Sequence, residues 1–146
     1  MITLHAACCT LGGAGILIRG EPGSGKSSLA LLLAAASDGA FVADDRVVCA
    51  IEEDRLVARP HPAIAGRVEV RGQGILALSD LGIPGCPETV LSLAVDLVPT
   101  VPRLPDPPDA AEVLGRRLPR VVLDRGVRAA GLAPLLVRSA LRKPGP

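Results

Sequence analysis

The sequence predicts one α/β domain over residues 1–146, in which a mixed sheet with few helices carries a phosphate-binding loop. The length of 146 residues fits a single domain of ordinary size. The pattern G-x-x-x-x-G-K-S at 20–27 lies between an apolar run and a helix-forming run, as in a P-loop. Most other apolar segments are short and bounded by glycine or charged turns, which favours many strands over an evenly alternating parallel sheet.

The phosphate-binding loop carries the clearest chemical signal in the chain. A strand is expected at 14–18, and a helix from 27 to about 37 that ends near Gly39. Glycines let backbone N–H groups turn onto phosphate oxygens, and the helix start adds its positive end there. Lys26 is expected to reach the β/γ-phosphates of a bound nucleotide, and Ser27 to offer a hydroxyl to Mg²⁺. The predicted nucleotide-binding residues are Gly20, Glu21, Pro22, Gly23, Ser24, Gly25, Lys26, Ser27 and Ser28.

Short extended segments account for most of the remaining chain. The run 68–71 alternates apolar and charged residues at the strand period, which puts Glu69 and Arg71 on one face. The charged residues 52–55 predict a hairpin turn between two apolar runs. Besides 14–18, strands are predicted at 4–10, 40–43, 46–51, 56–58, 68–71, 75–78, 91–98 and 121–123.

The C-terminal third is predicted to contain an irregular connection and one helix. Five prolines between 99 and 108 forbid a regular element and indicate an exposed, stiff connection. After the strand at 121–123, a turn is expected at Gly126. A closing helix is expected at 132–141, with Pro134 in its first turn.

Composition excludes several classes of function. The chain is 49% hydrophobic with Phe41 as its one aromatic residue, so the core is expected to be aliphatic. A net charge of +1 and the lack of Trp and Tyr argue against nucleic acid as a partner. No apolar run approaches the roughly 20 residues of a membrane span, and no secretory signal is recognisable. We therefore expect a cytoplasmic protein that does not bind membranes.

The four cysteines predict no metal or redox site. Cys8, Cys9, Cys49 and Cys86 show no C-x-x-C spacing. Cys8 and Cys9 are adjacent in a predicted strand, so their side chains should point to opposite faces. They are interpreted as small buried hydrophobic residues.

Three further features are candidates for chemistry. Asp44 and Asp45 follow a predicted strand, where one carboxylate could serve Mg²⁺ and the other could accept a proton, unless they form only a solvated turn. Glu69 and Arg71 could bind a metal and a phosphoryl group together, or form a surface ion pair. His5 taken alone is interpreted as structural, because an isolated histidine carries little information.

In order and spacing, these motifs resemble the catalytic C-terminal domain of the HPr kinase/phosphorylase family. The resemblance covers about residues 3–98 and includes His5, the P-loop, V-A-D-D at 42–45 and E-x-R-G-x-G-I at 69–75. It implies a bacterial serine kinase that uses ATP and Mg²⁺ to phosphorylate HPr, the phosphocarrier of the sugar phosphotransferase system. It also implies dephosphorylation with inorganic phosphate, a fold like the nucleotide-binding core of phosphoenolpyruvate carboxykinase, and a hexamer.

The resemblance also implies a role for individual residues. Asp44 would accept the proton of the HPr serine and return it in the reverse reaction. Lys26 would hold the transferred phosphate, with His5 supporting that site. Ser27 and Glu69 would coordinate Mg²⁺, and Asp45 would serve the metal or the neighbouring aspartate. Arg103, followed by Leu104, matches an arginine-leucine pair of the family and is expected to be catalytic.

The chain departs from the family pattern in three places, one of which is the minor change to Ser28 where the family has an acidic residue. It starts at the catalytic domain, as in shortened forms that lack the N-terminal domain. The family's P-V-R-P-G-R-N segment, tied to dephosphorylation, is reduced here to 123–128, which leaves phosphorylase activity and HPr docking open. Two alternatives therefore stand: a kinase of another protein or of a small hydroxylated metabolite, and a non-enzymatic ATP-binding regulator.

Overall fold

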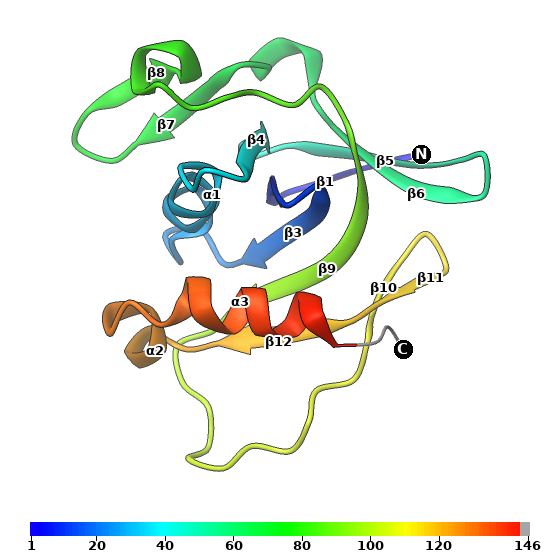
Figure 1. Ribbon diagram of the computed structural model, residues 1–146, viewed down its shortest axis with the longest axis vertical. Coiled ribbons are helices and arrows are strands. Elements are labelled where there is room, and N and C mark those ends of the chain that lie inside the picture. Colours follow the sequence, from blue (N-terminus) through cyan, green and yellow to red (C-terminus); the bar gives the residue numbers. More distant parts are fainter. Residues whose placement is uncertain (144–146) are drawn as a thin grey trace.

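The computed structural model describes residues 1–143 and shows a mixed eight-stranded sheet with helices on one face (Figure 1). The strand order is β1-β5-β6-β9-β3-β2-β4, and β12 pairs with β9. These strands are β1 (Ile2–Leu4), β2 (Ala7–Leu11), β3 (Ala14–Gly20), β4 (Gly39–Ala43), β5 (Val47–Glu52), β6 (Arg55–Pro60), β9 (Thr89–Leu97) and β12 (Arg120–Leu123).

Two hairpins and three helices complete the described chain. The hairpins are β7 (Arg67–Val70) with β8 (Gly74–Ala77), and β10 (Ala111–Val113) with β11 (Arg116–Leu118). The helices are α1 (Lys26–Ala34), α2 (Arg125–Ala129) and α3 (Ala133–Arg142), and 3-10 turns occupy Pro62–Ile64 and Leu78–Leu81. Within residues 1–143, no helix is long and apolar enough to cross a membrane.

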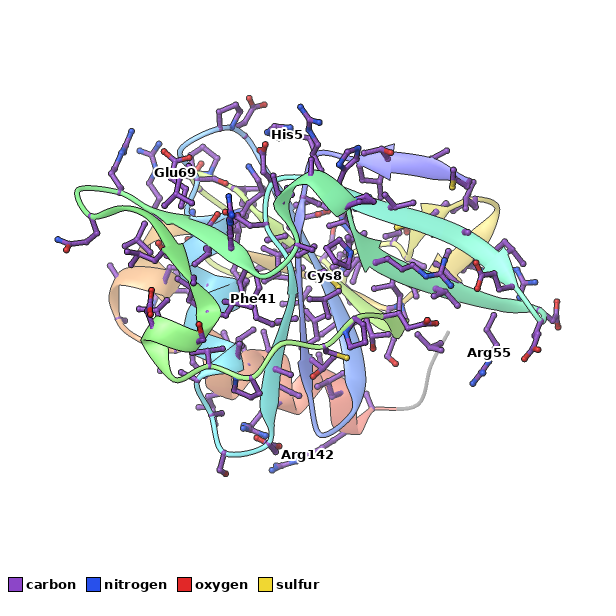
Figure 2. The ribbon with its side chains drawn as sticks, turned by 90° about the horizontal axis from the view of Figure 1, so that it is seen from above. His5, Cys8, Phe41, Arg55, Glu69 and Arg142 are labelled. Carbon is purple, nitrogen blue, oxygen red and sulfur yellow. The ribbon has the colours of Figure 1, made fainter. Side chains whose placement is uncertain are left out.

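Both faces of the central strands are buried, because residues alternate between two cores. Ile16 and Ile18 of β3 pack in a core with α1 and α3, whereas Leu17 packs in a core on the other face. Cys9 belongs to the first core and Cys8 to the second, as the strand period predicts. Phe41 fills the first core, and Figure 2 shows Cys8 and Phe41 inside the molecule. The core is therefore largely aliphatic, as the composition predicts.

The topology brings several strand ends to one edge of the sheet. β3 is parallel to β9, which is parallel to β12. β2 is antiparallel to both β3 and β4, so β4 runs in the same direction as β3. The residues after β3, β4, β9 and β12 therefore lie at the same edge, the usual position of ligand sites in open α/β sheets.

The structure differs from the sequence-based prediction in three segments. The predicted strand 4–10 is two strands, β1 and β2, because the chain bends at His5 and Ala6 to pair first with β5 and then with β3. The predicted turn at Gly126 is wrong: Gly126 lies in α2, whose start is capped by Asp124 accepting from the Val127 N–H at 2.8 Å. The β10–β11 hairpin was not predicted.

Candidate active site

The P-loop connects the end of β3 to the start of α1. Gly23 and Gly25 have φ angles of 79° and 97°, a left-handed conformation that strains other residues. A Cβ at Gly20 would lie 2.5 Å from Ser24 Oγ, so a side chain at position 20 would displace the loop. The left-handed backbone at Gly23 and Gly25 and the close approach at Gly20 explain why this turn needs glycine. The turn leaves the N-terminus of α1 facing the loop.

Lys26 lies over the start of the loop. Its side chain is almost buried, and its ammonium donates to the carbonyl oxygens of Gly20 at 2.9 Å and Glu21 at 3.1 Å. An ammonium has three donors, so one remains for a phosphate oxygen in this position. The two carbonyl contacts hold the charge where a phosphate would bind.

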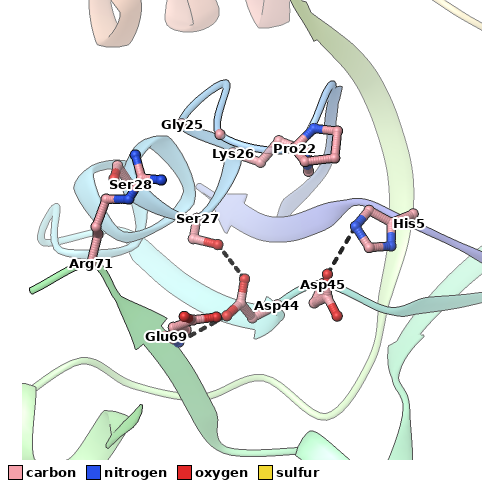
Figure 3. A pocket seen from close by; sticks show the side chains of 11 residues that line it. His5, Pro22, Gly25, Lys26, Ser27, Ser28, Asp44, Asp45, Glu69 and Arg71 are labelled. Atoms are coloured by element: carbon pink, nitrogen blue, oxygen red, sulfur yellow. Dashed lines mark hydrogen bonds and ion pairs between the residues drawn. The ribbon is translucent and has the colours of Figure 1, made fainter. Parts of the chain in front are cut away.

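Asp44 links the P-loop helix to the β7 strand. It follows β4 and is 6% exposed. Its Oδ1 accepts a hydrogen bond from Ser27 Oγ, and its Oδ2 accepts from the Glu69 backbone N–H at 2.9 Å (Figure 3). The Asp44 carboxylate is thus fixed beside the P-loop hydroxyl.

The Asp45 side chain contacts His5 and not the P-loop residue that Asp44 contacts. Its φ angle of 66° turns the chain sharply, and its Oδ1 lies 3.0 Å from His5 Nε2 (Figure 3). Both side chains are more than half exposed, at 57% and 61%. Figure 2 shows His5 and Glu69 near the same edge of the molecule. The His5–Asp45 pair therefore lies at the rim of the site.

One cavity of about 460 Å³ gathers most of the residues that the sequence predicts to be functional. Its lining residues come from the P-loop, from β4 and β7, and from the ends beside them. They are His5, Pro22, Gly23, Gly25, Lys26, Ser27, Ser28, Asp44, Asp45, Glu69 and Arg71. Gly20, Glu21 and Ser24 do not line this cavity. Their backbone carbonyls instead accept hydrogen bonds from Lys26 and Arg128, which hold the loop in place.

Arg103 is the predicted catalytic residue that the fold does not bring to this cavity. It is exposed on the proline-rich connection between β9 and β10, and it does not line the cavity. That connection has no regular secondary structure, as its prolines predict. The catalytic role of Arg103 therefore stays a prediction.

The donors in the cavity fit Mg²⁺ bound together with phosphates. Ser27 offers a hydroxyl, and Asp44, Asp45 and Glu69 offer carboxylates, which are hard oxygen ligands. Across the described residues, no three His, Cys, Asp or Glu side chains are grouped closely enough to hold a metal by themselves. Mg²⁺ commonly takes one or two protein oxygens and fills its remaining positions with water and phosphate oxygens.

Arg128 is a site residue for which the sequence predicted no role. Its guanidinium donates to three backbone carbonyls: Ser24, Val98 at 2.8 Å and Asp124 at 3.0 Å. These carbonyls follow β3, β9 and β12, the three parallel strands. Arg128 therefore ties the P-loop to the neighbouring strand ends.

A charged cluster lies in the sheet just before the P-loop. Arg19 donates to Asp96 at 2.7 and 2.9 Å, and Arg120 donates to the same carboxylate at 2.6 Å. Burial alone would raise the pKa of Asp96, but the hydrogen bonds from Arg19 and Arg120 outweigh it and hold that pKa below its ordinary value. The cluster joins β3, β9 and β12 through side chains.

Comparison with known proteins shows which family the chain resembles. Residues 1–129 match the family model of the HPr Serine kinase C-terminal domain. A solved structure of the Hpr(Ser) kinase/phosphatase from Coxiella burnetii superposes with a TM-score of 0.81 at 29% identity, covering 95% of this chain and 90% of that one.

Two curated relatives carry the name HPr kinase/phosphorylase. The protein of Limosilactobacillus reuteri is 35% identical over 127 residues, which are 82% of this chain and 39% of that protein. The protein of Mycoplasma mycoides subsp. mycoides is 38% identical over 71 residues, 49% of this chain and 22% of that protein. The chain thus spans well under half the length of these relatives. By its family model and its fold, the chain belongs to the HPr Serine kinase C-terminal domain family.

Proposed function

We propose that the chain is a kinase that uses ATP and Mg²⁺ to phosphorylate a serine of the phosphocarrier HPr. The observation that carries this proposal is the contact between Ser27 Oγ and Asp44 Oδ1 in the cavity that Lys26 also lines. A phosphate-holding lysine, a metal-binding hydroxyl and a carboxylate that can accept a proton are then together. Phosphoryl transfer needs mainly positioning and neutralisation of charge, which these groups supply.

In the proposed reaction, the serine oxygen of HPr forms a bond to the γ-phosphorus while the bond from that phosphorus to the ADP oxygen breaks. Asp44 accepts the serine proton, and Lys26 together with the α1 N-terminus neutralises charge on the transferred group. Ser27 and Glu69 would hold Mg²⁺, with Asp45 beside them. When bound, the metal would neutralise phosphate charge and orient the phosphates. His5 would orient Asp45 through their contact at 3.0 Å.

The same groups can serve the reverse reaction. An oxygen of inorganic phosphate would form a bond to the phosphoserine phosphorus while the bond from that phosphorus to the serine oxygen breaks, which gives pyrophosphate, and protonated Asp44 would return its proton to the leaving serine oxygen. The names of the Limosilactobacillus reuteri and Coxiella burnetii proteins support including this activity in the proposal. A homo-oligomer, a hexamer by family resemblance, belongs to the proposal as well, and light scattering of the purified chain tests it.

The experiment that tests the proposal uses ATP labelled at the γ-phosphate, purified HPr and Mg²⁺. We expect label on HPr, and none on an HPr variant whose acceptor serine is replaced by alanine. Label on another protein or on a small hydroxylated metabolite would favour a kinase with a different substrate. ATP binding without any transfer would favour a nucleotide-dependent regulator.

A further inference from the structure

A second cleft, of about 200 Å³, adjoins the phosphate cavity. It lies between α1 and the segment that joins α2 to α3, which is on the same side of the sheet (Figure 1). Most of its lining is apolar or backbone, and Arg128 supplies its charged group. Its residues, which we call the base cleft, are Gly25, Ser28, Leu29, Leu32, Arg128, Gly131, Ala133 and Pro134.

The base cleft and the phosphate cavity share a wall. Gly25 and Ser28 line both, and both residues lie at the start of α1. A ligand with phosphates in the P-loop can therefore extend an apolar group into the base cleft without crossing another structural element. This continuity favours two parts of one molecule over two separate ligands.

The hydrogen bonds of the Arg128 guanidinium determine which of its surfaces a ligand in the cleft can contact. Its Nε, Nη1 and Nη2 atoms all donate within the guanidinium plane, to the carbonyls of Asp124, Ser24 and Val98. Three of the five guanidinium N–H groups are engaged in this way, which fixes the plane of the group and leaves its flat face and two N–H groups available to a ligand. A guanidinium face stacks on aromatic rings.

The other walls suit a flat ring. Leu29 and Ala133 are buried and present apolar surface, and Leu32 is 55% exposed at the cleft. Gly131 has a φ of 76° with open space where a Cβ would be, so no side chain blocks that side. The volume is below the roughly 300–1,000 Å³ of pockets for drug-sized ligands, which suits one ring system and not a whole molecule.

We propose that the base cleft binds the base of the nucleotide whose phosphates occupy the P-loop, with Arg128 stacking on the base and Leu32 covering it. This inference rests on the proposed use of ATP and adds the part of the site that distinguishes a nucleotide from inorganic polyphosphate. Inorganic tripolyphosphate, which has the phosphates and lacks the base, is the matching probe.

The first test removes apolar surface from the cleft. Leu32→Ser is expected to weaken Mg-ATP binding about fivefold, from the loss of about 40 Å² of contact at about 25 cal/mol per Å², and to leave tripolyphosphate binding unchanged. Leu135→Ser is the matched control, because Leu135 is an exposed leucine of α3, at 65%, that lines neither cavity. It should change neither affinity. Calorimetric titration measures both ligands.

The second test uses the chain's lack of Trp and Tyr. Leu32→Trp places a single indole at the cleft, whose emission should change on saturation with Mg-ATP and stay constant with tripolyphosphate. The same substitution at Leu135 should respond to neither ligand.

The outcomes separate this inference from the proposed function. If Mg-ATP binds but Leu32→Ser leaves its affinity unchanged, and the indole does not distinguish ATP from tripolyphosphate, the base lies elsewhere and the inference is wrong while the kinase proposal stands. If the parent chain binds neither ligand, the proposed function fails, and the base cleft fails with it.

Discussion

Arg128 donates a hydrogen bond to the backbone carbonyl of Ser24, so a side chain of α2 holds the P-loop from 104 residues further along the chain. The same guanidinium binds carbonyls that follow β9 and β12. A planar group with several fixed donors can join three carbonyls at once, which a single ammonium cannot do with the same geometry. The position of the P-loop therefore depends on a residue outside the P-loop motif.

Arg128→Lys should weaken Mg-ATP binding about five- to thirtyfold and lower the free energy of unfolding by about 1–3 kcal/mol, because hydrogen bonds to the P-loop and to Val98 are lost. Arg125→Lys is the control. Arg125 is exposed on the same helix and, among residues 1–143, makes no side-chain hydrogen bond. Calorimetric titration and urea unfolding measure the two effects. Equal behaviour of the two variants would contradict the role given to Arg128.

Asp44→Asn should lower phosphoryl transfer about 10²- to 10⁴-fold, because an amide cannot take the serine proton. The amide oxygen can still accept from Ser27, whereas its NH2 group replaces the oxygen that accepts from the Glu69 N–H, so Mg-ATP affinity should fall much less than the rate. Rapid-quench kinetics with saturating ATP isolate the chemical step. Asp80→Asn, an exposed aspartate outside the cavity, should leave the rate unchanged. Turnover of Asp44→Asn at the parent rate would show that another group is the base.

Ser27→Ala should raise the Mg²⁺ concentration needed for half-maximal transfer by about tenfold or more, because it removes one proposed metal ligand and the hydrogen bond to Asp44. Ser37→Ala, at an exposed position beyond α1, is the control. Activity titrated with MgCl₂ at fixed ATP gives the comparison. An unchanged Mg²⁺ requirement would remove Ser27 from the proposed metal site.

Asp96 predicts a pH dependence of stability. Because Arg19 and Arg120 lower its pKa in the folded state, the carboxylate binds protons more tightly in the unfolded chain. The carboxylate of Asp96 therefore makes its full contribution to the free energy of unfolding above about pH 3.9, the pKa of an aspartate in the unfolded chain. This contribution declines as the pH falls through the lower pKa that Asp96 has in the folded state. At pH 7 the free energy of unfolding of Asp96→Asn should be about 1–3 kcal/mol lower than that of the parent chain, and below about pH 4 the difference should be smaller. Urea unfolding at several pH values checks this, and a difference that grows at low pH would contradict it.

The cysteines predict a labelling pattern. Burial raises the pKa of Cys9 to about 12 and of Cys49 to about 11, and that of Cys8 well above its ordinary value. The reactive thiolate is therefore scarce at pH 8. Native protein should be alkylated at Cys86 at most, whereas urea should expose all four thiols to the reagent. Mass spectrometry counts the labels, and rapid native labelling of Cys49 would show that this strand opens readily.

The sequence predicted the parts of the site that local chemistry determines. The P-loop follows from glycine conformations and from the strand and helix beside it, and both flanking elements are confirmed. Asp44 and Asp45 were predicted beside the loop because they follow a strand, and the family resemblance implied which of the two would take the proton. The parallel directions of β3 and β4 explain why these strand ends meet. The family and the fold class are confirmed by the family model and the Coxiella burnetii structure.

The parts that the sequence did not predict depend on tertiary contacts. The β10–β11 hairpin has three-residue strands, too short for a recognisable period, and turns through Leu114 and Gly115 with φ angles of 51° and 77°. Gly126 reads as a turn residue, but the Asp124 cap and packing keep it helical. No local pattern shows that Arg128 reaches Ser24, because that contact exists only after β3 and β12 join the same sheet.

The pairing of β3 with β9 has a consequence for biosynthesis. Residues 15–20 pair with residues 91–97, so the strand that carries the P-loop lacks this neighbour until β9 (Thr89–Leu97) has emerged from the ribosome. Such distant pairings form late, because closing the long intervening loop costs entropy before any contact compensates it. A nascent chain stalled before residue 89 should therefore expose the apolar residues of β3 to chaperones and be unable to retain ATP.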